Sequence, residues 1–209
     1  MFSYKSMIQN SEYVGLMQYL EALVMCDALE EMKGVSGIDI NIKWPNDVYV
    51  NKKTKICGIL CQSVYTNGMF DITSGIGINV SNRKPTTCIE QEVKELTGET
   101  IHLSRLWIYI SFINRAELLG RYIRIWNNYF PRFSKEGFKP FIEQYYAKWL
   151  HSNQSVNVMN DKGGYDSVII KGVGENGYLV AVDANGNTVE LLPDGNTFNF
   201  LEGLISKKL

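Results

Sequence analysis

Two apolar stretches joined by Asn67 and Gly68 constrain the fold of this chain more than any other feature of its sequence. Residues 55–65 and 69–80 are rich in β-branched and apolar side chains, which is the composition of β-strands. Asn-Gly is a favoured two-residue turn between antiparallel strands because both residues tolerate a positive φ. Apolar and polar residues also alternate over residues 38–43, as in a half-buried strand. We therefore predict an antiparallel meander.

Helical periodicity lies on both sides of this meander. Apolar residues recur at helical spacing over residues 11–32, where Asn10 or Ser11 is a suitable N-cap, so we expect an amphipathic helix there. The same spacing recurs in three later segments, at residues 89–96, 103–130 and 138–150. This order of elements predicts the α+β class, with helices and a mixed or antiparallel sheet, rather than a doubly wound fold.

The end of the chain has a different pattern. After residue 152, short alternating segments are separated by turn-forming pairs such as Gly163-Gly164 and Asn185-Gly186. This spacing is typical of a small β barrel or sandwich. We place a domain boundary near Ser152, which divides the chain into residues 1–152 and 153–209.

The composition argues against several classes of partner. Lysine and arginine number 21 against 22 aspartate and glutamate residues, so the chain lacks the basic excess that favours binding to nucleic acid. The longest apolar run, residues 106–113, is far shorter than the roughly 20 residues of a membrane span. The first ten residues show no targeting pattern, and four cysteines among 209 residues suit a reducing compartment. We expect a cytoplasmic protein with no nucleic-acid or membrane partner.

Three polar motifs are candidates for a binding site. KWPND (43–47) brings a cation, an indole, an amide and a carboxylate together between two predicted strands, as small-molecule pockets do. Lys55 begins the next strand, where a cation can meet a carboxylate or phosphate, and GIGIN (75–79) combines two glycines with an amide. Each has an ordinary interpretation as well: a turn with a packed tryptophan, a solvated lysine, and close strand packing. Cys57 and Cys61 have no histidine at zinc-like spacing, so no dedicated metal ligands are expected.

Taken together and in order, these motifs resemble the biotin protein ligases, the family also called holocarboxylase synthetases, and its eukaryotic form in particular. The resemblance rests first on KWPNDV (43–48), KICGIL (55–60) and GIGINV (75–80). It continues through PTTC (85–88), YYAKWLHS (145–152) and LLPDGNTFNF (191–200). It implies a class II synthetase-like catalytic domain, here truncated, followed by a small SH3-like β-barrel.

The resemblance also implies a two-step reaction. The carboxylate of biotin attacks the α-phosphate of ATP to give biotinyl-AMP and pyrophosphate, and a lysine on the biotin carrier domain of a carboxylase then attacks the acyl carbon. Mg²⁺ is expected with ATP, because the chemistry is largely positioning and offsetting of phosphate charge.

By position in the motifs, the resemblance implies a role for each site residue. Lys55 would be the catalytic residue, contacting biotin and the acyl phosphate. The residues expected to bind biotin or biotinyl-AMP, besides Lys55, are Trp44, Asn46, Asp47 and Gly58. The residues expected on the ATP and Mg²⁺ side are Asp47, Gly77 and Asn79, and Lys43 is assigned a structural role.

The sequence departs from the family at its start, where no GRGR loop precedes residues 1–6. In the family that loop folds over biotinyl-AMP, so without it we expect weaker biotin binding and leakage of the reactive intermediate to water. Three interpretations stay open: a biotin ligase whose chain is longer, an inactive homologue that acts as an interaction module, and a relative that activates lipoate or a fatty acid.

Overall fold

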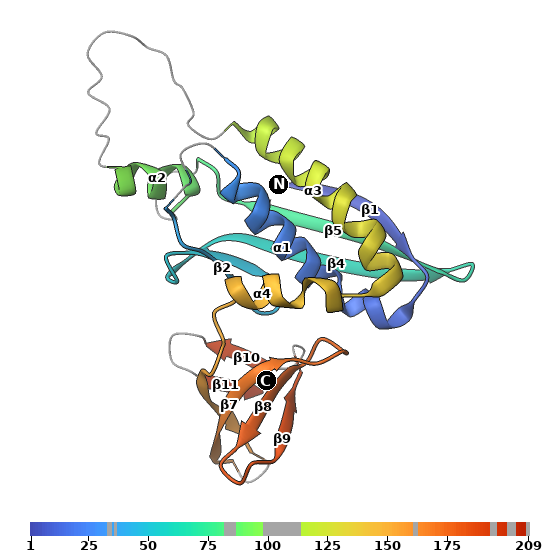
Figure 1. Cartoon of the computed structure of the whole chain (residues 1–209). Helices are drawn as coiled ribbons and strands as arrows, with labels where there is room; N and C mark the ends of the chain where they lie inside the picture. The colour runs from blue at the N-terminus through green and yellow to red at the C-terminus, as the bar shows by residue number, and fades with distance from the viewer. Residues whose placement is uncertain are drawn as a thin grey trace. The chain divides into compact units, whose positions relative to one another are not determined.

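The computed structural model (Figure 1) describes residues 1–32, 35, 37–81, 87–97, 114–160, 163–192, 196–199 and 204–207. The chain divides into two compact units, Met1–Leu150 and His151–Leu209. Within these described ranges, each unit contains one sheet, and the helices belong to the first unit. No helix among the described ranges is both long enough and apolar enough to cross a membrane.

The first unit is built on a five-stranded antiparallel sheet. Its strands are β1 (Phe2–Ile8), β2 (Ile40–Lys43), β3 (Asp47–Val50), β4 (Thr54–Thr66) and β5 (Met69–Ile78). Their order across the sheet is β1-β5-β4-β3-β2, and every neighbouring pair is antiparallel. Asn67 and Gly68 join β4 to β5 with φ values of 53° and 81°, as the hairpin requires. The predicted meander is confirmed.

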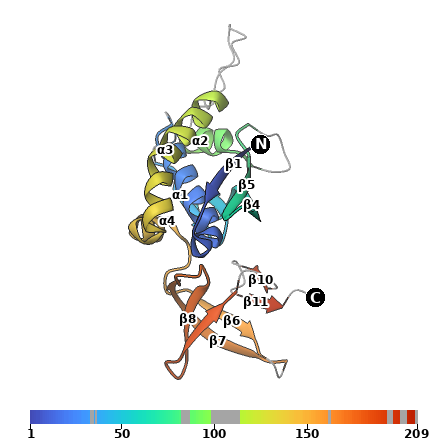
Figure 2. The same cartoon turned by 90° about the vertical axis from the view of Figure 1, so that its right-hand side faces the viewer.

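Helices cover one face of this sheet, as the two views at right angles show (Figures 1 and 2). The helical elements are a 3₁₀ turn at Ser11–Leu16, α1 (Met17–Glu30), α2 (Ile89–Thr97), α3 (Arg115–Glu136), a 3₁₀ turn at Lys139–Phe141, and α4 (Ile142–Lys148). α1 contacts β2, β3 and β4 on one side and α3 and α4 on others. The α+β class is therefore confirmed, and the opposite sheet face carries no helix in the part of the chain that is described.

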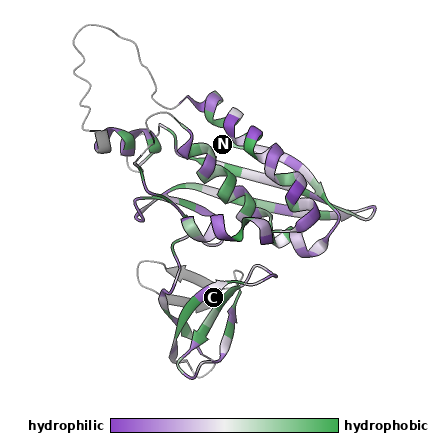
Figure 3. Cartoon of the chain, viewed as in Figure 1, coloured by the Kyte–Doolittle hydropathy of each residue, from purple (hydrophilic) through white to green (hydrophobic). Residues whose placement is uncertain are grey.

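α1 corrects one expectation. We expected an amphipathic helix, but eleven of its 14 residues are buried, and Figure 3 shows it in mostly hydrophobic colours. The cause is its place between the sheet and two other helices, which leaves it no broad solvent face. A helix that is apolar all round is a core helix. The one acidic residue that this helix buries completely is Glu21.

α3 ends later than the predicted segment 103–130. Residues 103–113, with the apolar run 106–113, lie outside the described residues; the helix itself begins after Asn114, whose side chain caps it by accepting from two backbone N–H groups. At the other end it continues through Pro131 to Glu136.

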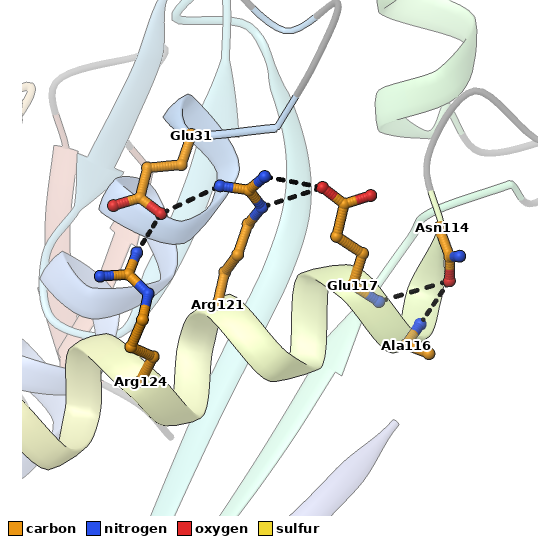
Figure 4. A network of polar contacts seen from close by, with 6 residues as sticks. All are labelled: Glu31, Asn114, Ala116, Glu117, Arg121 and Arg124. Atoms are coloured by element: carbon orange, nitrogen blue, oxygen red, sulfur yellow. Dashed lines mark hydrogen bonds and ion pairs between the residues drawn. The ribbon is translucent and has the colours of Figure 1, made fainter.

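A network of charged side chains holds α3 against the end of α1 (Figure 4). Arg121 pairs with Glu117 on its own helix at 2.7 Å and with Glu31 at 3.2 Å, and Arg124 also contacts Glu31. The two guanidinium groups, Arg124 first, hold the pKa of Glu31 below its usual range. This network is largely exposed, so its effect on stability is modest.

The second unit is a six-stranded sheet. Its strands are β6 (Ser155–Met159), β7 (Tyr165–Val173), β8 (Leu179–Asp183), β9 (Thr188–Leu191), β10 (Asn196–Asn199) and β11 (Leu204–Lys207). Their order is β10-β11-β6-β7-β8-β9, with β11 and β6 parallel and the other pairs antiparallel. Alternate residues of β7, including Val168 and Ile170, are buried. The SH3-like barrel stays a prediction.

Candidate active site

The KWPND motif forms the turn from β2 to β3, and Asn46 fastens that turn to β4. Its side-chain amide donates to the carbonyl of Ile59 at 2.7 Å, and its own carbonyl accepts from the N–H of Ile59 at 3.0 Å. Two hydrogen bonds to one residue fix the turn beside β4 in a defined position. Asn46 therefore holds the β2–β3 turn in place at the edge of the site. Its predicted contact with substrate stays a prediction.

Trp44 lies on the sheet face that the helices cover. Its side chain is 4% exposed, and its indole N–H donates to the hydroxyl of Tyr19 on α1 at 3.0 Å. A buried indole that has found a partner is typical of a packing residue. The geometry favours this role over direct binding of substrate, which stays untested.

Lys55 and Asp47 form an ion pair on the face of the sheet away from α1. The ammonium nitrogen of Lys55 lies 2.6 Å from the Oδ1 of Asp47, and Asp47 is opposite Gly58 in the β3–β4 register. A Cβ atom added to Gly58 would lie 3.2 Å from both the Cε and the Nζ of Lys55 and 3.5 Å from Oδ1 of Asp47. Gly58 therefore provides the space through which Lys55 reaches Asp47.

Lys43 adds a second cation near the same carboxylate. It is opposite Asp47 in the β2–β3 register, and its ammonium lies 5.8 Å from the centre of the Tyr49 ring. Burial lowers the pKa of Lys43, and Lys55 lowers it further, whereas Asp47 opposes the change. Two lysines around one carboxylate leave a local positive charge, which suits an anionic ligand.

The glycines of the third motif keep the sheet surface bare. Gly77 is opposite Gly58, and Cβ atoms added to Gly75 and Gly77 would meet only backbone oxygens, at 3.8 and 3.9 Å. Those are ordinary contacts, so close strand packing does not require these glycines. The alternative interpretation of the motif as tight packing has no support here, and the open backbone can be approached by a ligand.

A shallow depression of about 450 Å³ collects most of the predicted residues. It is lined by Met1, Lys55, Ile56, Cys57, Gly58, Gly77, Ile78 and Asn79. The backbone N–H of Asn79 donates to the carbonyl of Ile56 at 2.7 Å, which holds the end of β5 beside β4. The structure thus brings Lys55, Gly58, Gly77 and Asn79 together, with Asp47 paired to Lys55; neither Trp44 nor Asn46 lines the depression.

A second depression, of about 390 Å³, was not predicted. Met1 and Ile78 line it as well, together with Phe2, Val80 and three residues from the start of α3: Arg115, Leu118 and Leu119. No local motif marks Arg115, whose guanidinium donates to the Ser81 hydroxyl at 2.6 Å. Only tertiary packing of α3 against the sheet reveals this surface.

Cysteine and metal chemistry have no visible site in the described ranges. Burial raises the pKa of Cys57 to about 12, so its thiol stays protonated and is a poor nucleophile at neutral pH. The four cysteines are free. Across the described ranges, His, Cys, Asp and Glu side chains nowhere form a group of three or more that could hold a metal ion.

Comparisons with known proteins agree with the motifs. Residues 2–79 match the Biotin/lipoate A/B protein ligase family. Over its full length the chain is 37% identical to "Biotin--protein ligase 1, chloroplastic" and 36% identical to "Biotin--protein ligase 2", both of Arabidopsis thaliana. The chain spans only 56% and 62% of the lengths of these two relatives.

A solved structure shows the same fold. The biotin protein ligase of Aquifex aeolicus in complex with biotin and ATP is 24% identical, with a TM-score of 0.60 over 91% of this chain and 74% of that one. The chain is thus similar in fold to this ligase and similar in sequence, over its full length, to the two Arabidopsis thaliana ligases, and its residues 2–79 match the Biotin/lipoate A/B protein ligase family.

Proposed function

We propose that this chain carries the phosphate side of a biotin protein ligase, which makes biotinyl-AMP from biotin and ATP and transfers biotin to a lysine of a carboxylase. The observation that carries the proposal is the Lys55–Asp47 ion pair, which lies beside Gly58 in an open depression of a chain related to these ligases. A cation at the floor of a site that glycines leave open is suited to an acyl phosphate.

In the first step, a carboxylate oxygen of biotin attacks the α-phosphorus of ATP, and the bond from that phosphorus to the β-phosphate bridging oxygen breaks. We assign to Lys55 the role of stabilising the negative charge that develops on the acyl phosphate. The Lys55 side chain is half exposed, so its ammonium group can move from Asp47 toward a ligand. Asp47 holds that ammonium in place before the ligand arrives, which lowers the cost of orienting it.

In the second step, the amine of the target lysine attacks the acyl carbon, and AMP leaves with the electrons of the acyl–oxygen bond. Gly58 and Gly77 leave backbone exposed beneath the reacting groups, and Asn79 lines the same depression. The apolar side chains of the second depression, such as Ile78 and Leu118, offer a surface to the uncharged part of the adenylate.

Mg²⁺ fits this site as a partner of the nucleotide. Mg²⁺ in such enzymes is bound by one or two protein oxygens together with substrate phosphates and water, rather than by a full protein cage. Asp47 and Asn79 supply a carboxylate and an amide oxygen for that role. When bound, the ion would offset phosphate charge.

Biotin carrier domains of carboxylases are the proposed protein partners, and we propose that an SH3-like second unit, residues 153–209, assists in docking them. The near-balance of charge, 21 cationic against 22 anionic residues, gives no basis for a nucleic-acid partner. A cytoplasmic location remains part of this proposal.

The test is biotin-dependent exchange of labelled pyrophosphate into ATP, with Mg²⁺, by the purified chain, run beside circular dichroism to show that it is folded. Lys55→Ala should remove the exchange, because Lys55 is the one lysine or arginine side chain among the described residues that line the depression. Lys53→Ala is the matched control, since Lys53 is an exposed lysine two residues away and should keep the wild-type rate.

Three results would decide whether the chain activates biotin. Exchange that requires biotin and Lys55 supports the proposal. Exchange with lipoate but not biotin would reassign the chain to the lipoate branch of the family. No exchange with either acid from a folded sample would refute adenylation by these 209 residues and favour an interaction module.

A further inference from the structure

A single buried carboxylate ties α1 to three neighbouring strands. Glu21 is fully buried, and its carboxylate accepts hydrogen bonds from the hydroxyl of Ser74 on β5 and from the thiol of Cys61 on β4 at 3.4 Å. The hydroxyl of Tyr4 on β1 is near enough to favour the ionised form of Glu21. Ser74 is the direct cross-strand partner of both Tyr4 and Cys61. The three side chains therefore form one row across the sheet.

The environment of Glu21 contains no cation among the described residues. The titratable groups that act on it or respond to it are Tyr4 on β1, Cys57 and Cys61 on β4, and Tyr122 on α3. Each of these is a weak acid that is neutral near pH 7. Burial without a counter-charge raises the pKa of Glu21 to about 7, so both protonation states are accessible under physiological conditions.

The two protonation states require different hydrogen bonds. A carboxylate only accepts, so the side chains of the row can all donate to it. A carboxylic acid has one O–H to donate, so one of these side chains, the hydroxyl of Ser74 or Tyr4 or the thiol of Cys61, has to accept it. Tyr4 is also 3.0 Å from the Tyr122 hydroxyl on α3, so a change at Tyr4 would extend to that helix.

This row lies under the same two strands that form the candidate site. Cys61 and Ser74 are three residues along β4 and β5 from the paired glycines Gly58 and Gly77, which is about 10 Å at the rise of a strand. The side chains of the row face α1, whereas the site lies on the opposite face. A change in how β4 and β5 pack on α1 would therefore reach the glycine pair through the same two strands.

Cys61 lies between Glu21 and the surface of the first unit. This cysteine is partly exposed and lines a small depression of about 140 Å³, between the start of α1 and the β4–β5 hairpin. The same thiol contacts the carboxylate of Glu21. The carboxylate is therefore one side chain away from this depression.

We propose that Glu21 is a proton-sensitive positioning residue: its protonation state sets how β4 and β5 lie on α1, and through Gly58 and Gly77 it sets the ligand affinity of the site near neutral pH. The effect on affinity rests on the proposed function. The movement of the strands does not, because it belongs to the chain without ligand.

The first test uses the unliganded wild-type chain. The side-chain carboxyl carbon of Glu21 and the backbone amides of Gly58 and Gly77 are followed by NMR as the pH is raised from about 5 to about 8.5. All three signals should change with one shared midpoint near pH 7. Glycine amides that stay still while Glu21 titrates, or a Glu21 midpoint at the ordinary value, would overturn the proposal.

The second test compares variants. Glu21→Gln is neutral at every pH, so its glycine amides should show no transition; Glu143→Gln is the matched control, because Glu143 is exposed on α4 and its variant should retain the wild-type transition. In biotin-dependent pyrophosphate exchange, the wild-type KM for biotin should change by about threefold or more between pH 6 and 8. The KM of Glu21→Gln for biotin should not change with pH. It should equal the wild-type value at pH 6, because the amide resembles the protonated acid.

Failures of the two proposals can be told apart. If no variant exchanges pyrophosphate at any pH but the glycine amides follow Glu21, the ligase function fails and the positioning role survives. If exchange occurs with the same pH dependence of KM in wild type and Glu21→Gln, the ligase function survives and the positioning role is refuted. If Glu21→Gln does not fold, the wild-type NMR titration decides alone.

Discussion

Replacing Glu21 by glutamine should change how the stability of the first unit depends on pH. The folded state raises the pKa of Glu21 from 4.5 to about 7 because burial penalises the charged form. The folded state therefore holds this proton more tightly than the unfolded state does. The corresponding stabilisation is complete below pH 4.5, decreases as the pH rises toward 7, and is absent above it.

The magnitude follows from the size of the shift. A difference of 2.5 pKa units, from 4.5 to about 7, corresponds to about 3 kcal/mol over the whole range, at about 1.4 kcal/mol per unit. Between about pH 5 and about pH 8 the contribution is about 2.5 kcal/mol, because the unfolded carboxyl is already mostly ionised at pH 5. Glutamine does not titrate, so the stability of the variant relative to wild type should rise by this amount.

Urea unfolding followed by tryptophan fluorescence can measure this difference. All four tryptophans lie in residues 1–150, so the signal reports on the first unit. Subtracting wild type from variant at each pH cancels groups that both proteins share, and Glu143→Gln provides the baseline for removing an exposed glutamate. A stability difference between variant and wild type that is constant from pH 5 to 8, or that falls as the pH rises, would refute the assignment of a raised pKa to a Glu21 that is buried without a counter-charge.

Three further predictions concern other residues. Trp44→Ala should lose about 3 to 5 kcal/mol in urea unfolding followed by circular dichroism, and Trp44→Phe only about 1 kcal/mol, because the indole fills the core and donates one hydrogen bond. Gly58→Ala should reduce pyrophosphate exchange about tenfold or more with under about 1 kcal/mol of destabilisation, since its Cβ displaces Lys55; wild-type exchange would contradict this. Arg121→Ala should lower the midpoint of thermal unfolding only slightly, and less at high salt; a large loss that salt does not reduce would contradict the exposed character of this network.

The strands could be predicted because their signals are local. The Asn67-Gly68 turn fixes the register of β4 on β5, and alternation over a few residues marks the strands themselves. The environment of α1 could not be predicted in this way. Its apolar residues have helical spacing, but whether one face or every face is covered depends on α3 and α4, which follow about a hundred residues later.

The site could be predicted only where its residues lie close together in the sequence. Asp47 and Lys55 are eight residues apart on adjacent strands, so motif order was enough to connect them. The side to which Trp44 points was not evident, because its neighbours Lys43 and Asp47 lie on the opposite face. Arg115 reaches the second depression only through the packing of α3 on the sheet, and nothing in its local sequence indicates this.

Glu21 illustrates what a pattern of alternation conceals. The polar side chains around it come from positions 4, 61 and 74, and the two on β4 and β5 lie where alternation requires core residues: Ser74 lies between the buried Ile72 and Ile76. From the sequence alone, Cys61 and Ser74 are each predicted to be small residues that a core tolerates. Once the register brings them into one row facing a carboxylate, they become its solvation shell, because a buried charge is tolerated only where donors surround it. The strands that expose glycines to a ligand on one face thus contact, with the other face, the proton-binding Glu21 of α1, which couples the proposed pH response of the site to the packing of the sheet on this helix.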